Sequence, residues 1–480
     1  MNRSRLFLLL PLGLAGACQA APDGGLAVAA RAAITTPGID LIAIGSLPGS
    51  IGDRATETSG ALENGVAGNL LGGLGSGIAY AGLDRFVAIP DRGPNAVSYD
   101  APVDDTTSYI DRFQTIHMRL RPNAAGAALP FTLTPTLEET TLLYSRTPLV
   151  YGSGAGLGVA AGAPALNRRH RDYFTGRSDN YEPARPSGDD RDARLDPESI
   201  RVANDGQSVF VSDEYGPHVY QFDRHTGERL RTFPLPAEFS ITQLSPRGDV
   251  EISGNSVGRV SNKGMEGLAL SPDGKMLFGA MQSPLLQDGG TDGRFTRVVT
   301  IEICTGATHQ YAYELTNIGT ANKPKYPTVS DVVAINGHEL VVDERDGKGR
   351  GDGSTAAYKM LYRIDLAGAV DVGGIFGDAS LDGKAVDKSA LVDVVAALNA
   401  HGIDSNDIPA KLEGLAFGPD LVIDGALKHT LWLANDNDFV ANLVDALHPA
   451  GIDNPNQFFV FAVDAAALPG YVAQQLRAPF

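Results

Sequence analysis

A two-strand pattern occurs five times in this sequence, and it constrains the fold more than any other feature. Each repeat opens on a polar or acidic residue, runs into a short apolar strand, and reaches a second apolar strand after a turn. The openings begin at Ser76, Glu198, Glu266, Asp331 and Glu413. The second strands end on polar clusters that begin at Asp91, Asp213, Gln282, Asp343 and Asn435. In an antiparallel hairpin these two ends are neighbours, so each repeat gathers its polar groups at one end.

Repetition of a small antiparallel unit predicts an all-β fold, a β-propeller with four-stranded blades around a channel. Five blades are legible. The interval from Ser76 to Glu198 has room for a further blade of about 40 to 50 residues, so six or seven blades stay open. The lone apolar strand at residues 39–45 is expected to close the last blade, because closure removes an exposed sheet edge.

The first residues have the pattern of an export signal. Arg3 and Arg5 precede the apolar run 6–14, and small residues precede Cys18. The string Ala-Gly-Ala-Cys resembles a bacterial lipoprotein box, in which Cys18 carries the lipid; cleavage after Ala17 or Ala20 is the alternative. We therefore expect a signal peptide at 1–17 and export to the bacterial periplasm or cell envelope, with secretion as the alternative.

The rest of the chain is expected to form a linker at 18–38 and one propeller domain at 39–480. The segment 167–194 is dense in Arg, Asp and His, and we expect it to be a loop insertion over the channel mouth. Once Cys18 is lipidated or removed, Cys304 is the remaining cysteine, so no intramolecular disulfide is expected. The sequence alone does not give the oligomeric state.

Net charge limits the partners of this chain. The formal charge of −18 disfavours nucleic acid and anionic membrane surfaces. No apolar stretch reaches the roughly 18 residues typical of a membrane span, so membrane attachment is expected only through a lipid on Cys18. A small molecule is the expected partner.

Several unusual strings resemble those of the bacterial exported phytase-like family, also described as esterase-like activity of phytase. They are Asp-Arg-Gly-Pro-Asn (91–95), Asp-Pro-Glu-Ser-Ile (196–200), Ser-Asp-Glu-Tyr-Gly-Pro (212–217), Asn-Lys-Gly-Met-Glu-Gly-Leu (262–268), Lys-Leu-Glu-Gly-Leu-Ala-Phe (411–417) and Asn-Asp-Asn-Asp-Phe (435–439). The resemblance implies a propeller and hydrolysis of ester or phosphoester substrates.

A cluster of carboxylates at one end of the channel favours a bound cation, and Ca²⁺ suits oxygen ligands in flexible geometry. The expected metal ligands are Glu198, Asp213, Glu266, Glu413 and Asp436. Glu266, Glu413 and Asp213 are the candidate catalytic residues. The alternative is that each acid caps backbone N–H groups or pairs with a neighbouring Arg or Lys.

Basic residues lie next to these acids in the sequence. Arg92, Lys263 and Arg345 are the expected contacts for a substrate phosphate, because a cation would hold the oxygens that a metal polarises. Salt bridges to the acids are the alternative role. We therefore predict a calcium-dependent, phytase-like hydrolase of phosphoesters or esters.

Other chemistries fit less well. Gly254 to Gly258 matches Gly-x-Ser-x-Gly around Ser256, but the strand and helix that a nucleophile elbow needs are missing from the pattern. A lactonase built on a one-metal propeller and a non-enzymatic envelope propeller that binds glycans or proteins remain the alternatives.

Overall fold

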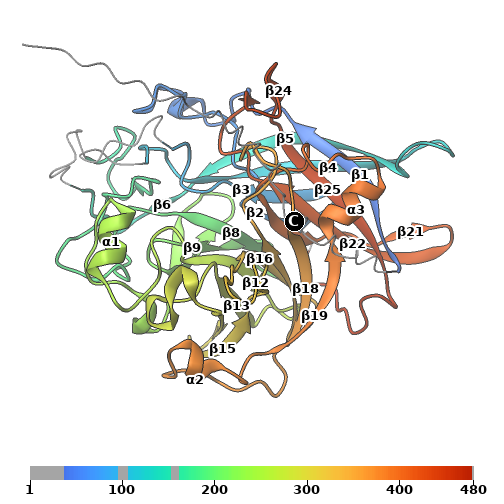
Figure 1. Ribbon diagram of the computed structural model, residues 1–480. Coiled ribbons are helices and arrows are strands. Elements are labelled where there is room, and N and C mark those ends of the chain that lie inside the picture. Colours follow the sequence, from blue (N-terminus) through green and yellow to red (C-terminus); the bar gives the residue numbers. More distant parts are fainter. Residues whose placement is uncertain (1–36, 96–105, 153–161, 478–480) are drawn as a thin grey trace, which may run out of the picture. The chain divides into compact units, whose positions relative to one another are not determined.

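The computed structural model describes residues 37–95, 106–152 and 162–477 (Figure 1). The prediction of a β-propeller is confirmed, with five blades. Five inner strands neighbour one another in a closed ring. They are β2 (Gly77–Gly82), β8 (Pro197–Val202), β12 (Met265–Leu270), β16 (Thr328–Ala334) and β20 (Leu412–Phe417). The signal peptide, Cys18 and most of the expected linker lie outside the described residues.

Each inner strand begins an antiparallel sheet of four strands in sequence, and the last sheet carries a short fifth strand, β21 (Leu421–Ile423), beside its second strand. The second strands are β3 (Arg85–Ile89), β9 (Ser208–Asp213), β13 (Met276–Met281), β17 (Glu339–Arg345) and β22 (Ala426–Asn435). The third strands are β4 (Arg112–Pro122), β10 (His218–Asp223), β14 (Phe295–Glu302), β18 (Lys359–Asp365) and β25 (Asn456–Asp464). The outer strands are β5 (Phe131–Leu142), β11 (Arg229–Pro234), β15 (Thr308–Glu314), β19 (Asp387–Asp393) and β1 (Ile39–Leu47).

Short elements decorate the blades. The strand pairs are β6 (Tyr144–Ser145) with β7 (Asp172–Tyr173), β23 (Asn442–Leu443) with β24 (Ile452–Asp453), and β21 (Leu421–Ile423) with β22. The α-helices are α1 (Gly248–Gly254), α2 (Asp378–Leu381) and α3 (Val394–Ala400). Single 3-10 turns occupy Thr56–Thr58, Ala237–Phe239, Leu286–Asp288 and Gly290–Asp292. Within the described residues, we find no helix that is both long and apolar enough to cross a membrane.

The N-terminal strand closes the ring as predicted. β1 runs antiparallel to β25, with Ile39 opposite Val463, and completes the last blade. The long first interval does not contain a sixth blade. The first blade's own strands β4 and β5, with 11 and 12 residues, take up much of this interval. The β6–β7 pair and loops take up the rest.

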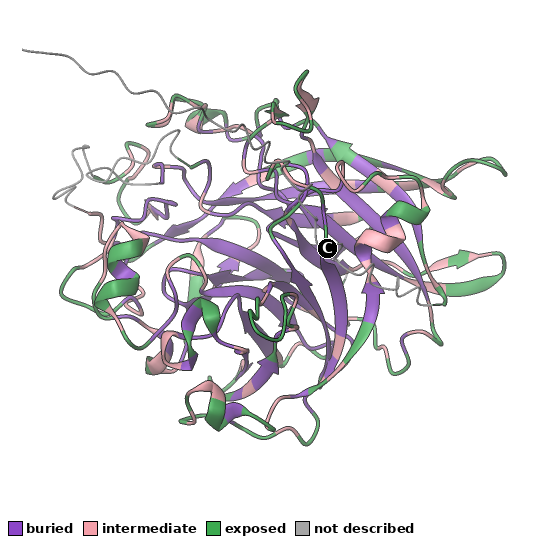
Figure 2. Cartoon of the chain, viewed as in Figure 1, coloured by how far each residue is buried: buried purple, intermediate pink, exposed green. Residues whose placement is uncertain are grey.

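Apolar side chains fill the spaces between blades. Five separate clusters of buried residues each join two adjacent blades. In one of them the Trp432 ring packs against Phe86 with centroids 4.4 Å apart, which links the last blade to the first. Burial of one such side chain contributes about 1.5–3 kcal/mol relative to exposure. Figure 2 shows the inner strands as buried, with most exposed residues on outer loops and helices.

A buried ion pair lies inside the ring and binds all five inner strands together. The Arg201 guanidinium donates to Asp331 Oδ2 over 2.8 Å and to the carbonyl oxygens of Ile78, Val332 and Leu415. Asp331 also accepts hydrogen bonds from the Ser199 hydroxyl and from the backbone N–H groups of residues 268 and 415. The pair therefore provides hydrogen-bond partners for backbone carbonyl and N–H groups of the inner strands that face the channel.

Candidate functional site

Two rings of residues surround the end of the channel where the inner strands begin. The first ring is formed by Ser76, Glu198, Glu266, Ser330 and Glu413. The second ring, at the ends of the second strands, is formed by Asp91, Glu214, Gln282, Arg345 and Asp436. Strand register defines this equivalence. In every blade, the residue two places after the first-ring position pairs with the residue three places before the second-ring position.

The fourth blade differs from the expected alignment by one residue. The expected opening was Asp331, but the register places Ser330 in the first ring and Asp331 one step deeper. The bulge between Val329 and Val332 has counterparts in the second, third and fifth blades, so this strand keeps the common register and the expected alignment lay one residue too far along the chain. Because side chains alternate along a strand, a shift of one residue moves Asp331 out of the ring and into the Arg201 pair.

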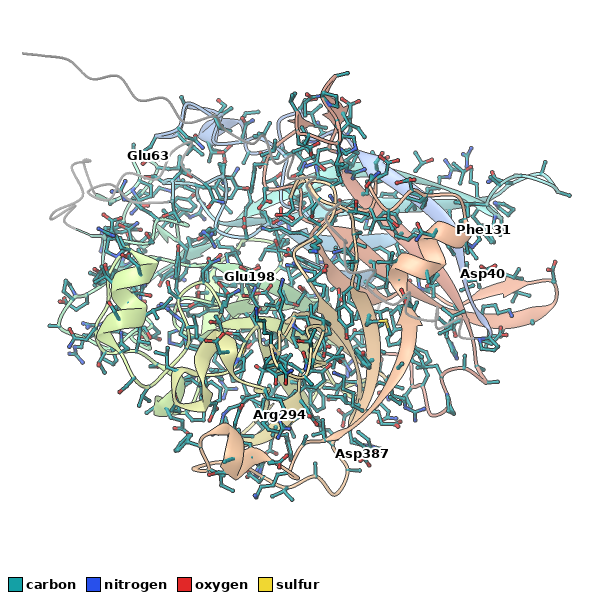
Figure 3. All side chains as sticks on the ribbon, in the orientation of Figure 1. Asp40, Glu63, Phe131, Glu198, Arg294 and Asp387 are labelled. Atoms are coloured by element: carbon teal, nitrogen blue, oxygen red, sulfur yellow. The ribbon has the colours of Figure 1, made fainter. Side chains whose placement is uncertain are left out.

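The rings enclose a cavity of about 250 Å³, which we call the carboxylate cavity. Its charged lining residues are Asp91, Glu198, Glu214, Glu266, Glu413, Arg92, Lys263, Arg345 and Lys411. Among the side chains labelled in Figure 3, Glu198 lies nearest the middle of the view. The cavity brings six of the predicted site residues together, three acids and three bases.

Three of the four cations of this cavity are already paired with carboxylates. Arg92 Nη1 lies 2.9 Å from Asp196 Oδ2, and Arg345 binds Glu413. Lys411 Nζ bridges Asp436 at 2.6 Å and Asp438 at 2.5 Å. Lys263 is different, because its Nζ donates to the neutral amide oxygen of Gln282 over 3.0 Å and has no carboxylate within ion-pair distance among the described residues. Lys263 is therefore the cation best placed to meet an incoming anion.

Two of the buried carboxylates lack the partners that burial normally demands. Glu266 Oε2 has no hydrogen-bond partner in the described part of the chain. Glu198 likewise makes no hydrogen bond or ion pair there, although only 7% of it is exposed. An unpaired buried carboxylate is costly unless it is neutralised by a proton or a cation. Glu198 and Glu266 lie on neighbouring blades. A cation bound between them would neutralise both carboxylates.

Burial also perturbs the acid–base behaviour of these groups. Burial, and then the neighbouring Glu266, raises the pKa of Glu198 well above its usual range. Burial, and then Glu214, raises the pKa of Glu266 in the same direction. Burial together with Asp196 raises the pKa of Glu214 to about 7. Without a cation, this part of the cavity therefore favours protonated acids near neutral pH.

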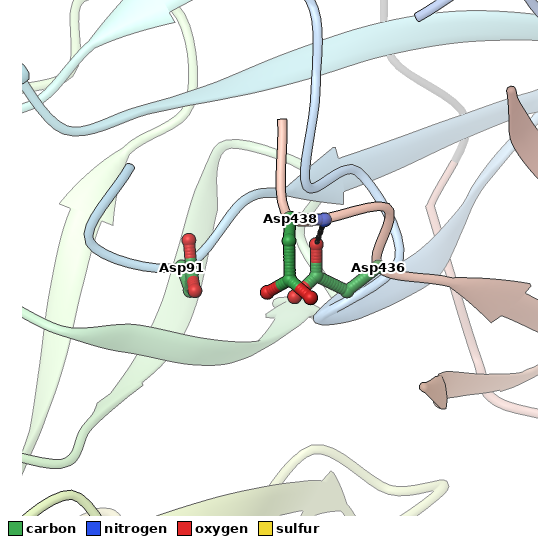
Figure 4. A group of neighbouring side chains, drawn as sticks. All are labelled: Asp91, Asp436 and Asp438. Atoms are coloured by element: carbon green, nitrogen blue, oxygen red, sulfur yellow. Dashed lines mark hydrogen bonds between the residues drawn. The ribbon is translucent and has the colours of Figure 1, made fainter. Parts of the chain in front are cut away.

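Two groups of three acids have geometry that could hold a metal ion. In each group, oxygens of all three residues lie within 4.8 Å of one another. The groups are Asp196, Glu198 and Glu214, and Asp91, Asp436 and Asp438. Figure 4 shows the second group, in which the Asp438 N–H donates to Asp436 Oδ1 over 2.7 Å. Lys411 pairs with two acids of this second group, whereas in the first group Arg92 pairs with Asp196 alone, so the first group is the better metal site.

Asp213 does not line the carboxylate cavity. Its Oδ1 accepts from the N–H groups of Asp196 and Tyr215, and its Oδ2 accepts from Gly216. Glu214, the next residue, occupies the second ring instead and lines the cavity. Of the other predicted residues, Asp436 lies behind the cavity in the group with Lys411, and Cys18 lies outside the described residues.

The segment 167–194 packs against the site from behind Arg92. Gly176 approaches so closely that a Cβ atom there would lie 1.7 Å from the Arg92 carbonyl oxygen. Arg177, in the same segment, is buried and pairs with Asp179 and Glu63. Ser256 is exposed in a bend that follows α1, so no helix follows it as a nucleophile elbow would need.

Comparison with known proteins identifies the family. The Phytase-like family, described as esterase-like activity of phytase, matches residues 69–439. The chain belongs to this family. The matched region contains every residue that lines the carboxylate cavity of this phytase-like chain.

Individual relatives and solved structures are less similar to this chain than the family model is. An uncharacterized secreted protein of Arthroderma benhamiae is 31% identical over 282 residues, which cover 52% of this chain and 52% of the relative. The match thus spans about half the length of that curated relative. The major allergen Mala s 1 of Malassezia sympodialis is 12% identical, with coverage of 85% and 82% and a TM-score of 0.33. The PQQ-bound aldose sugar dehydrogenase of Streptomyces coelicolor is 12% identical, with coverage of 90% and 97% and a TM-score of 0.30.

The structure adds residues that sequence reasoning did not assign to the phytase-like site. Asp196 and Asp438 belong to the two acid groups, and Asn262 accepts a hydrogen bond from Arg92. All three lie within one to three residues of predicted site residues. Asp196 lies in the string Asp-Pro-Glu, and Asn262 precedes Lys263, so both could have been proposed from their neighbours. Proximity in the sequence does not show which side chains face the cavity.

Proposed function

We propose that the chain is an exported, metal-dependent hydrolase that acts on phosphoesters at the carboxylate cavity, with Ca²⁺ as the metal. One observation carries this proposal: two buried carboxylates, Glu198 and Glu266, line the same cavity as Lys263, and neither of them forms an ion pair within the described residues. Membership of the phytase-like family supports a hydrolytic role.

The donor set fits a hard cation. Glu198 and Glu214, with Asp196 behind them, bring oxygens within 4.8 Å of one another, and Glu266 Oε2 is a further free acceptor in the same cavity. Oxygen ligands of this kind suit Ca²⁺. When bound, such an ion polarises a phosphoryl oxygen and lowers the pKa of bound water.

The basic residues would bind and orient the substrate. Lys263 would meet the phosphate directly, since its present partner is a neutral amide. Arg92 is held by Asp196 and can present its remaining N–H groups, because a guanidinium has five donors. Arg345 is engaged by Glu413 and by the Ser330 hydroxyl at 2.8 Å, so we assign these two residues to shaping the cavity wall.

A carboxylic ester or lactone is the second candidate substrate. The observation that favours it is the commitment of Arg92, Arg345 and Lys411 to carboxylates, which leaves only Lys263 unpaired by an acid within the described cavity. A substrate without a phosphate needs fewer cations. Comparison of matched phosphoester, ester and lactone substrates in the presence of Ca²⁺ and of EDTA tests both candidates.

Replacing Lys263 with alanine is expected to weaken phosphoester turnover while metal content stays unchanged. Loss of one charged hydrogen bond costs about 1.5–3 kcal/mol, so KM should rise by roughly 10- to 100-fold. Steady-state kinetics with p-nitrophenyl phosphate and elemental analysis of the same samples provide the measurement. Lys275→Ala is the matched control, because Lys275 is an exposed lysine in the turn of the same blade. An unchanged KM in the Lys263 variant would contradict this role.

Stability of the metal-free protein is expected to fall as pH rises from 5 to 8. The folded-state pKa of Glu214 and of Asp436 is raised to about 7, by burial first in both cases. Acids with raised pKa stabilise the fold while protonated, and this contribution is lost as pH passes through the folded pKa. Ca²⁺ competes with these protons, so it should raise the melting temperature more at pH 8 than at pH 5. Melting curves in EDTA and in Ca²⁺ at both pH values test this; a metal-free protein that gains stability over this range would contradict it.

Export is the proposed localisation. The relative from Arthroderma benhamiae is described as secreted, and the first residues of this chain have the pattern of a signal peptide. Expression in a bacterial host should give a mature chain that starts at Cys18 or Ala21, as measured by intact mass. A diacylglyceryl group on Cys18 would indicate a lipoprotein, whereas an unprocessed Met1 would exclude both forms of export.

A further inference from the structure

The third and fifth blades share a lysine arrangement but give the lysine different partners. In each of these blades a lysine lies two or three residues before the first-ring glutamate, and it donates to the second-ring residue of its own blade. In the fifth blade Lys411 Nζ lies 2.6 Å from Asp436 Oδ2. In the third blade Lys263 Nζ lies 3.0 Å from Gln282 Oε1. The second-ring partner is thus an acid in the fifth blade and a neutral amide in the third.

Gln282 is the uncharged member of a ring whose other members are all charged. It lines the carboxylate cavity, and only 9% of the residue is exposed. Its backbone is fixed on both sides, because its N–H donates to the Gly264 carbonyl oxygen over 2.8 Å and its carbonyl oxygen accepts from the Val329 N–H over 3.1 Å. The side chain at this position therefore decides which group Lys263 Nζ meets.

The charge of this partner controls whether the lysine is available to an anion. An amide oxygen and a carboxylate oxygen both accept a hydrogen bond from an ammonium group, but only the carboxylate neutralises its charge. An anion that displaced an acid from Arg92, Arg345 or Lys411 would break an ion pair. At Lys263 the anion would replace only a hydrogen bond to a neutral amide.

We propose that Gln282 makes the carboxylate cavity selective for anionic substrates, because its amide holds Lys263 Nζ in the cavity without neutralising it. This inference rests on the proposed function and deepens it, since it names the residue that favours a phosphoester over an uncharged ester. Gln282 acts through Lys263 and is therefore a positioning residue. An acid at the same position would give the third blade the lysine–carboxylate pair of the fifth.

Gln282→Glu is expected to weaken the binding of phenylphosphonate, an anion without a hydrolysable phosphoester bond, in the presence of Ca²⁺. The dissociation constant should rise by roughly tenfold or more, since the new carboxylate pairs with Lys263 and repels the anion. Isothermal titration calorimetry measures this constant, and elemental analysis of the same samples measures calcium. Calcium content should not fall, because the added carboxylate is a further oxygen ligand. Damage to the cavity as a whole would lower both.

Two further variants separate charge from shape and from net charge. Gln282→Met, a neutral side chain of similar length, should bind phenylphosphonate roughly fivefold or more tightly than Gln282→Glu does. Gln207→Glu is the matched control, because it adds the same charge at an exposed position outside the carboxylate cavity. Melting curves confirm that the variants are folded. Gln282→Asp, with the acid that the fifth blade uses, replaces Gln282→Glu if that variant does not fold.

The Lys263→Ala background shows whether Gln282 acts through the lysine. There, adding Gln282→Glu should raise the dissociation constant by a smaller factor than it does in the parent. An equal factor in both backgrounds would mean that the new acid only repels the anion, which overturns the inference. Equal binding by the parent and by Gln282→Glu would overturn it too, but would leave the proposed function intact. A parent protein that does not bind phenylphosphonate in Ca²⁺ would contradict the proposed function and this inference together.

Discussion

Replacing Glu198 and Glu266 together with glutamine is expected to abolish the rise in melting temperature that Ca²⁺ gives to the parent protein. A ligand that binds only the folded state at 100 times its Kd adds about 2.7 kcal/mol of stability. For a chain of this size, that corresponds to a rise of about 3 °C. Within the described cavity, Glu198 makes no hydrogen bond or ion pair and Glu266 Oε2 has no hydrogen-bond partner, so the double variant removes the ligand atoms most available to the ion.

The same variant should be at least as stable as the parent in EDTA, because glutamine is a neutral side chain of the same size and never carries the buried charge that costs the parent stability once its acids ionise. Differential scanning calorimetry with and without Ca²⁺ measures both effects. Glu339→Gln is the control, since Glu339 pairs with Arg363 outside the carboxylate cavity and should leave the calcium response intact. A full calcium response in the double variant would place the ion at another site. A parent protein that does not respond to Ca²⁺ would argue that the acids are neutralised by protons alone.

The fold could be predicted from the sequence because its repeat is local. Each hairpin shows alternating apolar residues and a turn, and the five openings share one pattern. The blade count was not fixed, because loops and long strands in the interval after Ser76 have the same length as an extra blade. Closure by residues 39–47 was predictable, since an unpaired apolar strand before the first repeat needs an edge to complete.

The site could be predicted only to within one residue, because neighbouring side chains on a strand point to opposite faces. Asp213 and Glu214 are adjacent acids, and the sequence does not show that Glu214 faces the cavity while Asp213 binds backbone N–H groups. Ser330 and Asp331 are likewise adjacent, and the strand register places Ser330 in the first ring and Asp331 in the pair with Arg201. Contacts between blades, such as that between Arg201 and Asp331, join residues far apart in sequence and leave no local signal.

The Arg201–Asp331 pair gives the last prediction, in which Asp331→Asn is expected to destabilise the propeller severely. The substitution keeps the size of the side chain but leaves the Arg201 charge buried without its counter-ion. Removal of one partner of a buried pair typically costs 3–5 kcal/mol. In a chain of this length, that loss lowers the melting temperature by about 3–5 °C.

An exposed pair provides the contrast that tests this reasoning. Asp382 pairs with Arg294 at the surface, where 67% of the Asp382 side chain is exposed, so Asp382→Asn should leave the melting temperature almost unchanged. Calorimetry of the two variants in EDTA removes any contribution from metal. If Asp331→Asn melts with the parent, the pair does not bind the blades together. The apolar clusters between blades, which include neither residue of the pair, would then account for the packing of the five inner strands.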